Sequence, residues 1–219
     1  MKKYLLGILP LSGVTFFDFQ TYFRSSVILI FSLFILISGC KSGGQKSDDQ
    51  VSGTTVNEPV VQGFSVHEAA LNGETEKVIK FIEGAGNIDT LDSEGRTPLM
   101  YASFNGYTTI IRKLLENGAS VNIQDPYGRT ALMMASSGPY PDAVKLLLER
   151  SADPNLTDKE EHFTAIMYAA SEGQLEVVKL LLSKNADPSL KDVDGDDALT
   201  FAKNNGHYEV SVLLQSLKK

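Results

Sequence analysis

Apolar and small residues recur along the last two thirds of the chain with a period of 33 residues. The block at 97–102 (TPLMYA) returns at 130–135 (TALMMA) and at 164–169 (TAIMYA), in steps of 33 and 34 residues. Weaker versions stand one step earlier, at 64–69, and one step later, at 197–202. A fixed period of this length predicts a solenoid of stacked units and favours binding over catalysis.

Each unit contains two apolar stripes at helical spacing. In the first, an aliphatic residue is followed by alanine three positions later, and in the second, apolar residues recur three and four positions apart. Thr or Asp precedes the first stripe and can cap a helix, while glycine follows it and can end one. We therefore expect a pair of helices in each of five units. The first-stripe columns are Val66, Leu99, Leu132, Ile166 and Leu199, with Ala69, Ala102, Ala135, Ala169 and Ala202.

The first and last units carry polar residues in otherwise apolar columns. Lys77 and Lys80 stand where inner units have Ile110, Ala143 or Leu146, and in the last unit Ser211 and Gln215 stand in apolar columns. Terminal repeats of a solenoid need polar outer faces. The pattern predicts an array that is capped at both ends.

The charge and the cysteine content of the chain exclude several classes of function and site. Residues 1–39 carry a net charge of +2 (three basic, one acidic), and the remainder carries −9 (17 basic, 26 acidic). A basic face for nucleic acid or an anionic membrane is therefore not expected. Cys40 is the only cysteine, which excludes an intrachain disulfide and a cysteine-based zinc site.

Catalytic and metal-binding patterns are also lacking. The three histidines, His67, His162 and His207, lie in different units. The segment 192–197 has its glycine at position 4 and Lys203 at position 12, which does not fit a calcium loop. We expect no enzyme activity, no cofactor and no metal.

The N-terminus has the order of a secretory signal. Basic residues, the last of them Arg24, precede an eleven-residue run at 27–37 that is apolar apart from one serine. Such a run is too short to cross a hydrocarbon core of about 30 Å. We expect 1–39 to be a signal peptide and 41–62, rich in Gly, Ser, Asp and Gln, to be a flexible linker spanning about 25 Å.

The end of this signal, Ile37-Ser38-Gly39-Cys40, resembles the lipobox of bacterial lipoproteins. The resemblance implies that Cys40 becomes the diacylated N-terminus of an envelope protein. Lys41, in place of a retaining aspartate, implies an outer-membrane destination, with the lipid anchor as the only membrane contact. The alternatives are a secreted or periplasmic protein, an uncleaved anchor helix, or a mis-called start site.

The repeat itself resembles the ankyrin repeat. Residues 92–122 (DSEGRTPLMYASFNGYTTIIRKLLENGASVN) are close to a full unit. The resemblance implies an all-α repeat solenoid of helix–turn–helix pairs with projecting β-hairpin fingers over 63–219, in repeats 64–93, 94–126, 127–160, 161–193 and 194–219. Histidine usually follows Thr-Pro-Leu in this family. Here Met100, Met133 and Met167 replace it, which implies apolar packing instead of a hydrogen-bonded tie and a softer stack.

The same resemblance implies a protein partner bound at the finger tips and the exposed side of the first helices, on the concave face. We expect a monomeric, membrane-tethered binding module that does not bind nucleic acid. The alternative is an accessory, inhibitor or immunity-type protein that regulates one envelope enzyme or toxin. The implied contact residues are Ser93, Glu94, Arg96, Phe104, Asn105, Tyr127, Arg129, Ser137, Lys159, Glu160, Glu172, Asp194, Asp196 and Asn204.

Overall fold

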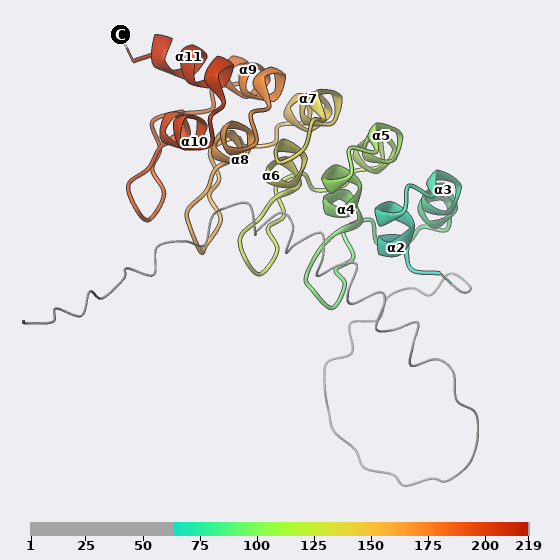
Figure 1. Ribbon diagram of the computed structural model, residues 1–219. Coiled ribbons are helices and arrows are strands. Elements are labelled where there is room, and N and C mark those ends of the chain that lie inside the picture. Colours follow the sequence, from blue (N-terminus) through green and yellow to red (C-terminus); the bar gives the residue numbers. More distant parts are fainter. Residues whose placement is uncertain (1–63, 219) are drawn as a thin grey trace, which may run out of the picture. The chain divides into compact units, whose positions relative to one another are not determined.

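The computed structural model describes residues 64–218, which form ten helices in five consecutive pairs (Figure 1). The signal, Cys40 and linker predictions fall on 1–62 and lie outside the described residues. The pairs are α2 (Val66–Leu71) with α3 (Thr75–Glu83), α4 (Pro98–Phe104) with α5 (Thr108–Glu116), α6 (Ala131–Ser136) with α7 (Pro141–Glu149), α8 (Ala165–Ser171) with α9 (Leu175–Ser183), and α10 (Ala198–Asn204) with α11 (Tyr208–Ser216).

The first helices of the pairs form one layer and the second helices form another (Figure 1). The core lies between successive pairs, where the aliphatic and alanine columns of the first helices are buried in all five units. Val78, Ile111, Val144 and Val178 continue this core along the second layer. Since these contacts join neighbouring units only, the array contains its own core and grows by addition of repeats.

Helix starts follow the chemistry that the sequence predicts, with one difference. Thr97 and Thr130 accept the N–H of the third helical residue through their hydroxyls. The expectation that methionine offers only apolar packing is wrong, because Sδ of Met100 lies 3.4 Å from the N–H donor of Thr97, and Met133 and Met167 repeat this contact at 3.5 Å. The thioether, a weak acceptor, satisfies a buried backbone donor at each of these starts.

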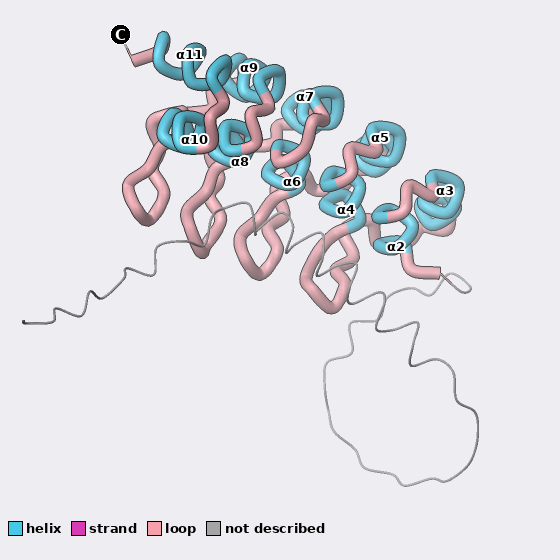
Figure 2. Tube along the Cα trace, viewed as in Figure 1, coloured by secondary structure: helices cyan, strands magenta, loops and turns pink. Residues whose placement is uncertain are grey.

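Four loops project from one side of the array, between successive pairs (Figure 2). We call them fingers 1 to 4, at residues 92–96, 125–129, 158–163 and 192–196. No residue within 64–218 is in a β-strand, so the expected β-hairpins are hairpin-shaped turns instead. One backbone hydrogen bond joins the first and last residue of each finger, from Asp92 to Arg96 in finger 1 (3.1 Å), and three to four intervening residues leave no room for a ladder.

Finger 3 adopts its turn without glycine. His162 has φ of 60° where Gly95, Gly128 and Gly195 of the other fingers have φ of 69° to 86°. This left-handed conformation is unfavourable for a residue with a Cβ.

We expect His162→Gly to stabilise the array by about 0.5–1 kcal/mol, because it removes this local strain at a modest entropic cost. Urea unfolding followed by circular dichroism measures the change. His162→Ala is the control, since it removes the ring but keeps the strain. Equal midpoints for the two variants would contradict the backbone explanation.

Candidate binding surface

Fingers 2 to 4 are joined to one another by backbone hydrogen bonds. The N–H of Lys159 donates to the carbonyl of Tyr127 (2.8 Å), and that of Val193 donates to the carbonyl of Glu161 (3.1 Å). Pro126 has no N–H at the equivalent position, and its ring packs on Gly95 of finger 1 instead. The fingers therefore form a continuous row of fixed geometry.

An aspartate at the first position organises each finger. Asp125 is fully buried and accepts backbone N–H bonds from Tyr127 and Arg129, while the Arg129 side chain donates to its second oxygen from Nε (2.9 Å). Arg96 approaches the same oxygen at 3.9 Å and also pairs with Glu94 (2.6 Å). Two arginines thus surround one desolvated carboxylate.

This network changes the predicted contact set. Arg96 is 6 % exposed, so the expectation that it presents its side chain to a partner is wrong. Arg129 is half-buried, with its guanidinium 4.7 Å from the centre of the Tyr127 ring. Both arginines hold the fingers in shape because the buried carboxylate requires positive charge beside it.

Two tyrosines stabilise the fingers through hydrogen bonds that the sequence did not predict. The hydroxyl of Tyr101 donates to Asp92 (2.6 Å), and that of Tyr168 donates to Asp158 (2.9 Å). Burial, together with the neighbouring carboxylate, raises the pKa of both phenols, so they remain donors. The available signal was a tyrosine nine or ten residues after the finger aspartate.

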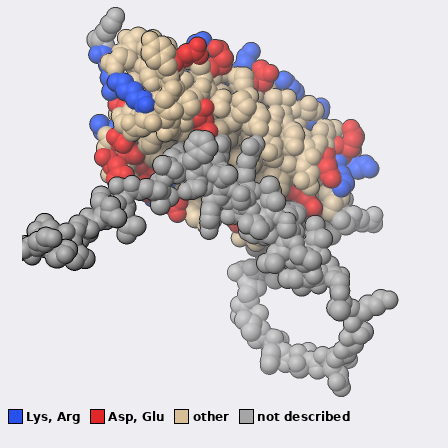
Figure 3. Space-filling model, in the orientation of Figure 1, with Lys and Arg blue, Asp and Glu red and all other residues tan. Residues whose placement is uncertain are grey.

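The tips of the row expose apolar and acidic side chains together. Tyr127 is 46 % exposed and Val193 is 52 % exposed. Acidic side chains gather over finger 4, which precedes α10 (Figure 3). The predicted residues Ser93, Glu94, Lys159, Glu160 and Asp194 are exposed, and Asp196 is partly exposed.

On the first-helix side of the predicted surface, several side chains hydrogen-bond within the array rather than facing solvent. Asn105 donates from Nδ2 to the carbonyl of Leu71 in the preceding repeat (2.9 Å), and Ser137 donates to the carbonyl of Met134 (2.9 Å). Phe104 is half-buried, whereas Asn204 is exposed. The finger tips therefore offer more free surface than this side.

Glu172 is the half-buried carboxyl of this side, and its pKa is raised because burial disfavours the charged form, with the nearby His207 acting in the opposite direction. A carboxyl with a higher pKa in the folded state destabilises the fold where it is ionised, above its unfolded pKa of about 4.3.

We expect Glu172→Gln to raise stability at pH 7 by about a few tenths of a kcal/mol, since water screens a half-exposed group. The gain should disappear as pH falls and Glu172 becomes protonated in both states. Urea unfolding of the variant and the parent at pH 7 and pH 4 measures it. A gain of equal size at both pH values would show that charge is not the cause.

Two of the three histidines hydrogen-bond to backbone carbonyls of other segments. Nε2 of His67 lies 2.9 Å from the carbonyl of Thr90, and Nε2 of His207 lies 2.8 Å from the carbonyl of Ser171. Within residues 64–218, no three His, Cys, Asp or Glu side chains are grouped as metal ligands. In the same part of the chain, no helix has the length and hydropathy needed to cross a membrane.

These features define the class of the protein: a helical solenoid whose repeats present a row of fingers. A family model described as ankyrin repeats (3 copies) matches residues 66–158 and 141–218. The chain belongs to the ankyrin-repeat family, whose members generally mediate protein–protein interactions and are typically non-catalytic. No curated protein matches the sequence.

Proposed function

We propose that this chain is a non-catalytic module that binds one protein partner across the tips of fingers 1 to 4. The observation that carries the proposal is the fixed row of fingers, which exposes Tyr127 on finger 2 and Val193 between the acidic residues of finger 4. Tyrosine is a residue type favoured in interface hot spots.

The charge of the row indicates the chemistry of the partner. Counted over the finger residues, the net charge is −1 in finger 1, 0 in finger 2, −2 in finger 3 and −3 in finger 4. The cause is that Arg96 and Arg129 have Phe163 and Asp196 at the equivalent positions of fingers 3 and 4. A basic surface with an apolar residue at its centre complements this end of the row.

Affinity capture from native membranes tests the proposal, with residues 63–219 as bait. We expect Tyr127→Ala to weaken capture of a stoichiometric partner, and Glu160→Lys with Asp194→Lys to weaken it further. Glu149→Lys, an exposed charge reversal on α7, is the control and should leave capture unchanged. Capture that survives the finger variants, with the fold intact, would refute the finger surface.

The activity of the captured partner also distinguishes a simple binding module from a regulator. A partner whose own enzymatic or toxic activity changes on binding would favour the accessory, inhibitor or immunity-type alternative. A partner without such a change would favour a tethering or scaffolding role.

We also propose that Cys40 is lipidated and holds the array at an envelope membrane, in the outer membrane where the cell has one. The support is the order of basic, apolar and small residues before the sole cysteine, followed by a linker at 41–62. Intact mass spectrometry of the mature protein tests this. A mature chain that begins at Cys40 and carries acyl groups is expected, and an unmodified Cys40 would end the idea.

A further inference from the structure

Four asparagines of the array are followed directly by glycine. The pairs at 72–73, 105–106 and 205–206 end the first helices α2, α4 and α10, and the pair at 117–118 follows α5. In this dipeptide the glycine nitrogen can attack the preceding carboxamide, because glycine has no Cβ to hinder the approach. The four pairs share this chemistry but differ in the hydrogen bonds that hold them.

Three of the four asparagine side chains are fixed by a hydrogen bond. Asn105 and Asn205 each donate from Nδ2 to a carbonyl of the preceding repeat (2.9 Å), and Asn117 donates to the carbonyl of Lys113 (2.8 Å). Asn72 is exposed, and its side chain forms no hydrogen bond within residues 64–218. The reason is its place in the array. No repeat of the described chain precedes α2, so Asn72 lacks the carbonyl that its equivalents bind.

The glycine N–H groups show the same contrast. Those of Gly106, Gly118 and Gly206 donate to the carbonyl three residues earlier, at 3.1 Å, 3.3 Å and 3.2 Å. The N–H of Gly73 makes no backbone hydrogen bond in the described part of the chain. Both reacting groups of the pair at 72–73 are therefore unbonded, whereas both are hydrogen-bonded in the other three pairs.

Reaction between these two groups also requires movement of the backbone. Asn72 has φ of −91° and ψ of −1°, and its ψ has to rotate before the nitrogen of Gly73 can reach the carboxamide. Such a rotation is a local opening of the turn after α2. It costs least at the end of an array, where terminal segments fray and where α2, among the described residues, has a neighbouring repeat on one side only.

We propose that Asn72 deamidates spontaneously in the folded protein, faster than the asparagines of the three other Asn-Gly pairs. The nitrogen of Gly73 loses its proton to water and bonds to Cγ of Asn72, while the amide nitrogen takes up a proton and leaves as ammonia. Water then opens the resulting succinimide ring at one of its two carbonyls. The product is aspartate, or isoaspartate where the chain continues through the side-chain carbonyl.

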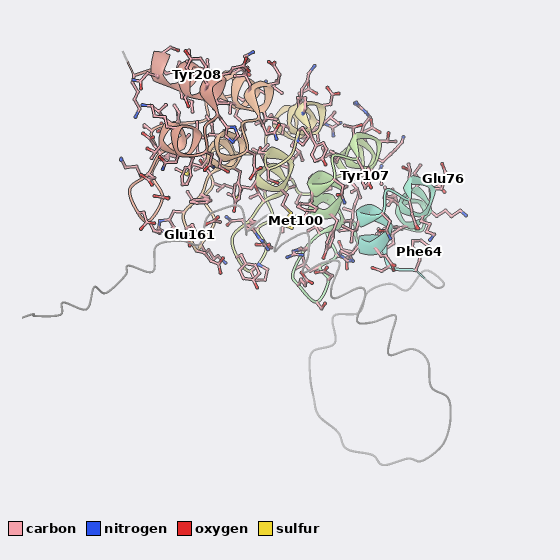
Figure 4. The ribbon with its side chains drawn as sticks, viewed as in Figure 1. Phe64, Glu76, Met100, Tyr107, Glu161 and Tyr208 are labelled. Atoms are coloured by element: carbon pink, nitrogen blue, oxygen red, sulfur yellow. The ribbon has the colours of Figure 1, made fainter. Side chains whose placement is uncertain are left out.

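Either product is expected to loosen the first repeat. A new carboxylate lies at the C-terminus of α2, where the helix dipole is negative, and isoaspartate adds one atom to the backbone of this turn. The ring of Tyr107, labelled in Figure 4, covers Gly73 from the second repeat, so a longer turn displaces this contact. Helix α2 also holds the chain before finger 1, because Nε2 of His67 lies 2.9 Å from the carbonyl of Thr90. The modification therefore reaches the first finger of the row.

Peptide mapping tests the order of reactivity, because trypsin releases the four pairs in four different peptides, 47–77, 97–112, 114–129 and 204–218. The purified protein is kept at neutral pH, and tandem mass spectrometry follows the conversion of amide to acid in each peptide. We expect Asn72 to react at least fivefold faster than the other three. In guanidinium chloride, where no fold protects them, the four rates should converge. Equal rates in the folded protein would overturn the proposal, as would the same excess at Asn72 in the unfolded chain.

Asn72→Gln is the matched control for the consequence. It keeps an exposed amide that closes no five-membered ring, and it removes no side-chain hydrogen bond found within residues 64–218. Hydrogen exchange compares fresh and aged samples of the parent and the variant. We expect exchange in α2 and residues 90–96 to quicken at least threefold in the aged parent and to stay unchanged in aged Asn72→Gln. Unchanged exchange in a fully converted parent would refute the loosening, and equal quickening in both proteins would assign it to another cause.

Discussion

Asp125→Ala is expected to destabilise the array by about 3 kcal/mol, because removal of one partner from a buried ionic network leaves the remaining charges uncompensated. The carboxylate of Asp125 is fully buried and lies 2.7 Å from the Arg129 guanidinium. Its loss also frees the backbone N–H groups of Tyr127 and Arg129. Urea unfolding at neutral pH measures the change.

Asp192→Ala is the matched control. Asp192 holds the same position in finger 4 and accepts the backbone N–H groups of Asp194 and Asp196, but that finger has no arginine. Loss of the turn bonds alone should cost about 1 kcal/mol, and relief of repulsion from its acidic neighbours offsets part of this. Equal losses for the two variants would show that the arginines contribute nothing beyond the turn.

The contrast between these two fingers also shows where sequence reasoning ends. The 33-residue period predicted the helix pairs and their buried columns, because an apolar face at helical spacing must be buried whatever lies next to it. Arg96 was predicted as a partner contact because the resemblance to ankyrin repeats places it on a finger. Its inward course depends on Asp125 of the neighbouring finger, 29 residues away, and no local pattern encodes that approach.

Another feature that was not predicted could have been found by comparing residues at equivalent positions of the repeats. Val212, an exposed residue of α11, stands in a column that is basic in the inner repeats (Arg112, Lys145 and Lys179), and a search for columns that change from charged to apolar identifies it. The methionine contacts are different, since only the geometry of the helix start shows Sδ of Met100 facing the N–H of Thr97. Composition predicts the burial of such a residue but not the donor that it satisfies.

Gly106→Ala is expected to cost about 2–3 kcal/mol, the second large effect in this array. Gly106 ends the first helix of its repeat with φ of 67°, a conformation that disfavours any residue with a Cβ. A Cβ at this position would also overlap the Tyr140 ring of the next repeat, so the ring has to move away from the interface. Unfolding by urea and by heat should both record the loss.

Gly206→Ala isolates the contribution of the ring. Gly206 has φ of 77° at the same position of the last repeat, but no atom beyond its chain neighbours lies within 4 Å of the site of a Cβ. Gly206→Ala should therefore destabilise the array only through its unfavourable backbone conformation, by about 1–2 kcal/mol. If Gly106→Ala lowers the free energy of unfolding no more than Gly206→Ala does, the Tyr140 ring can move aside without measurable cost. A larger loss would show that ring-on-glycine contacts, repeated where Tyr107 covers Gly73 and His207 covers Gly173, fix the spacing of successive repeats.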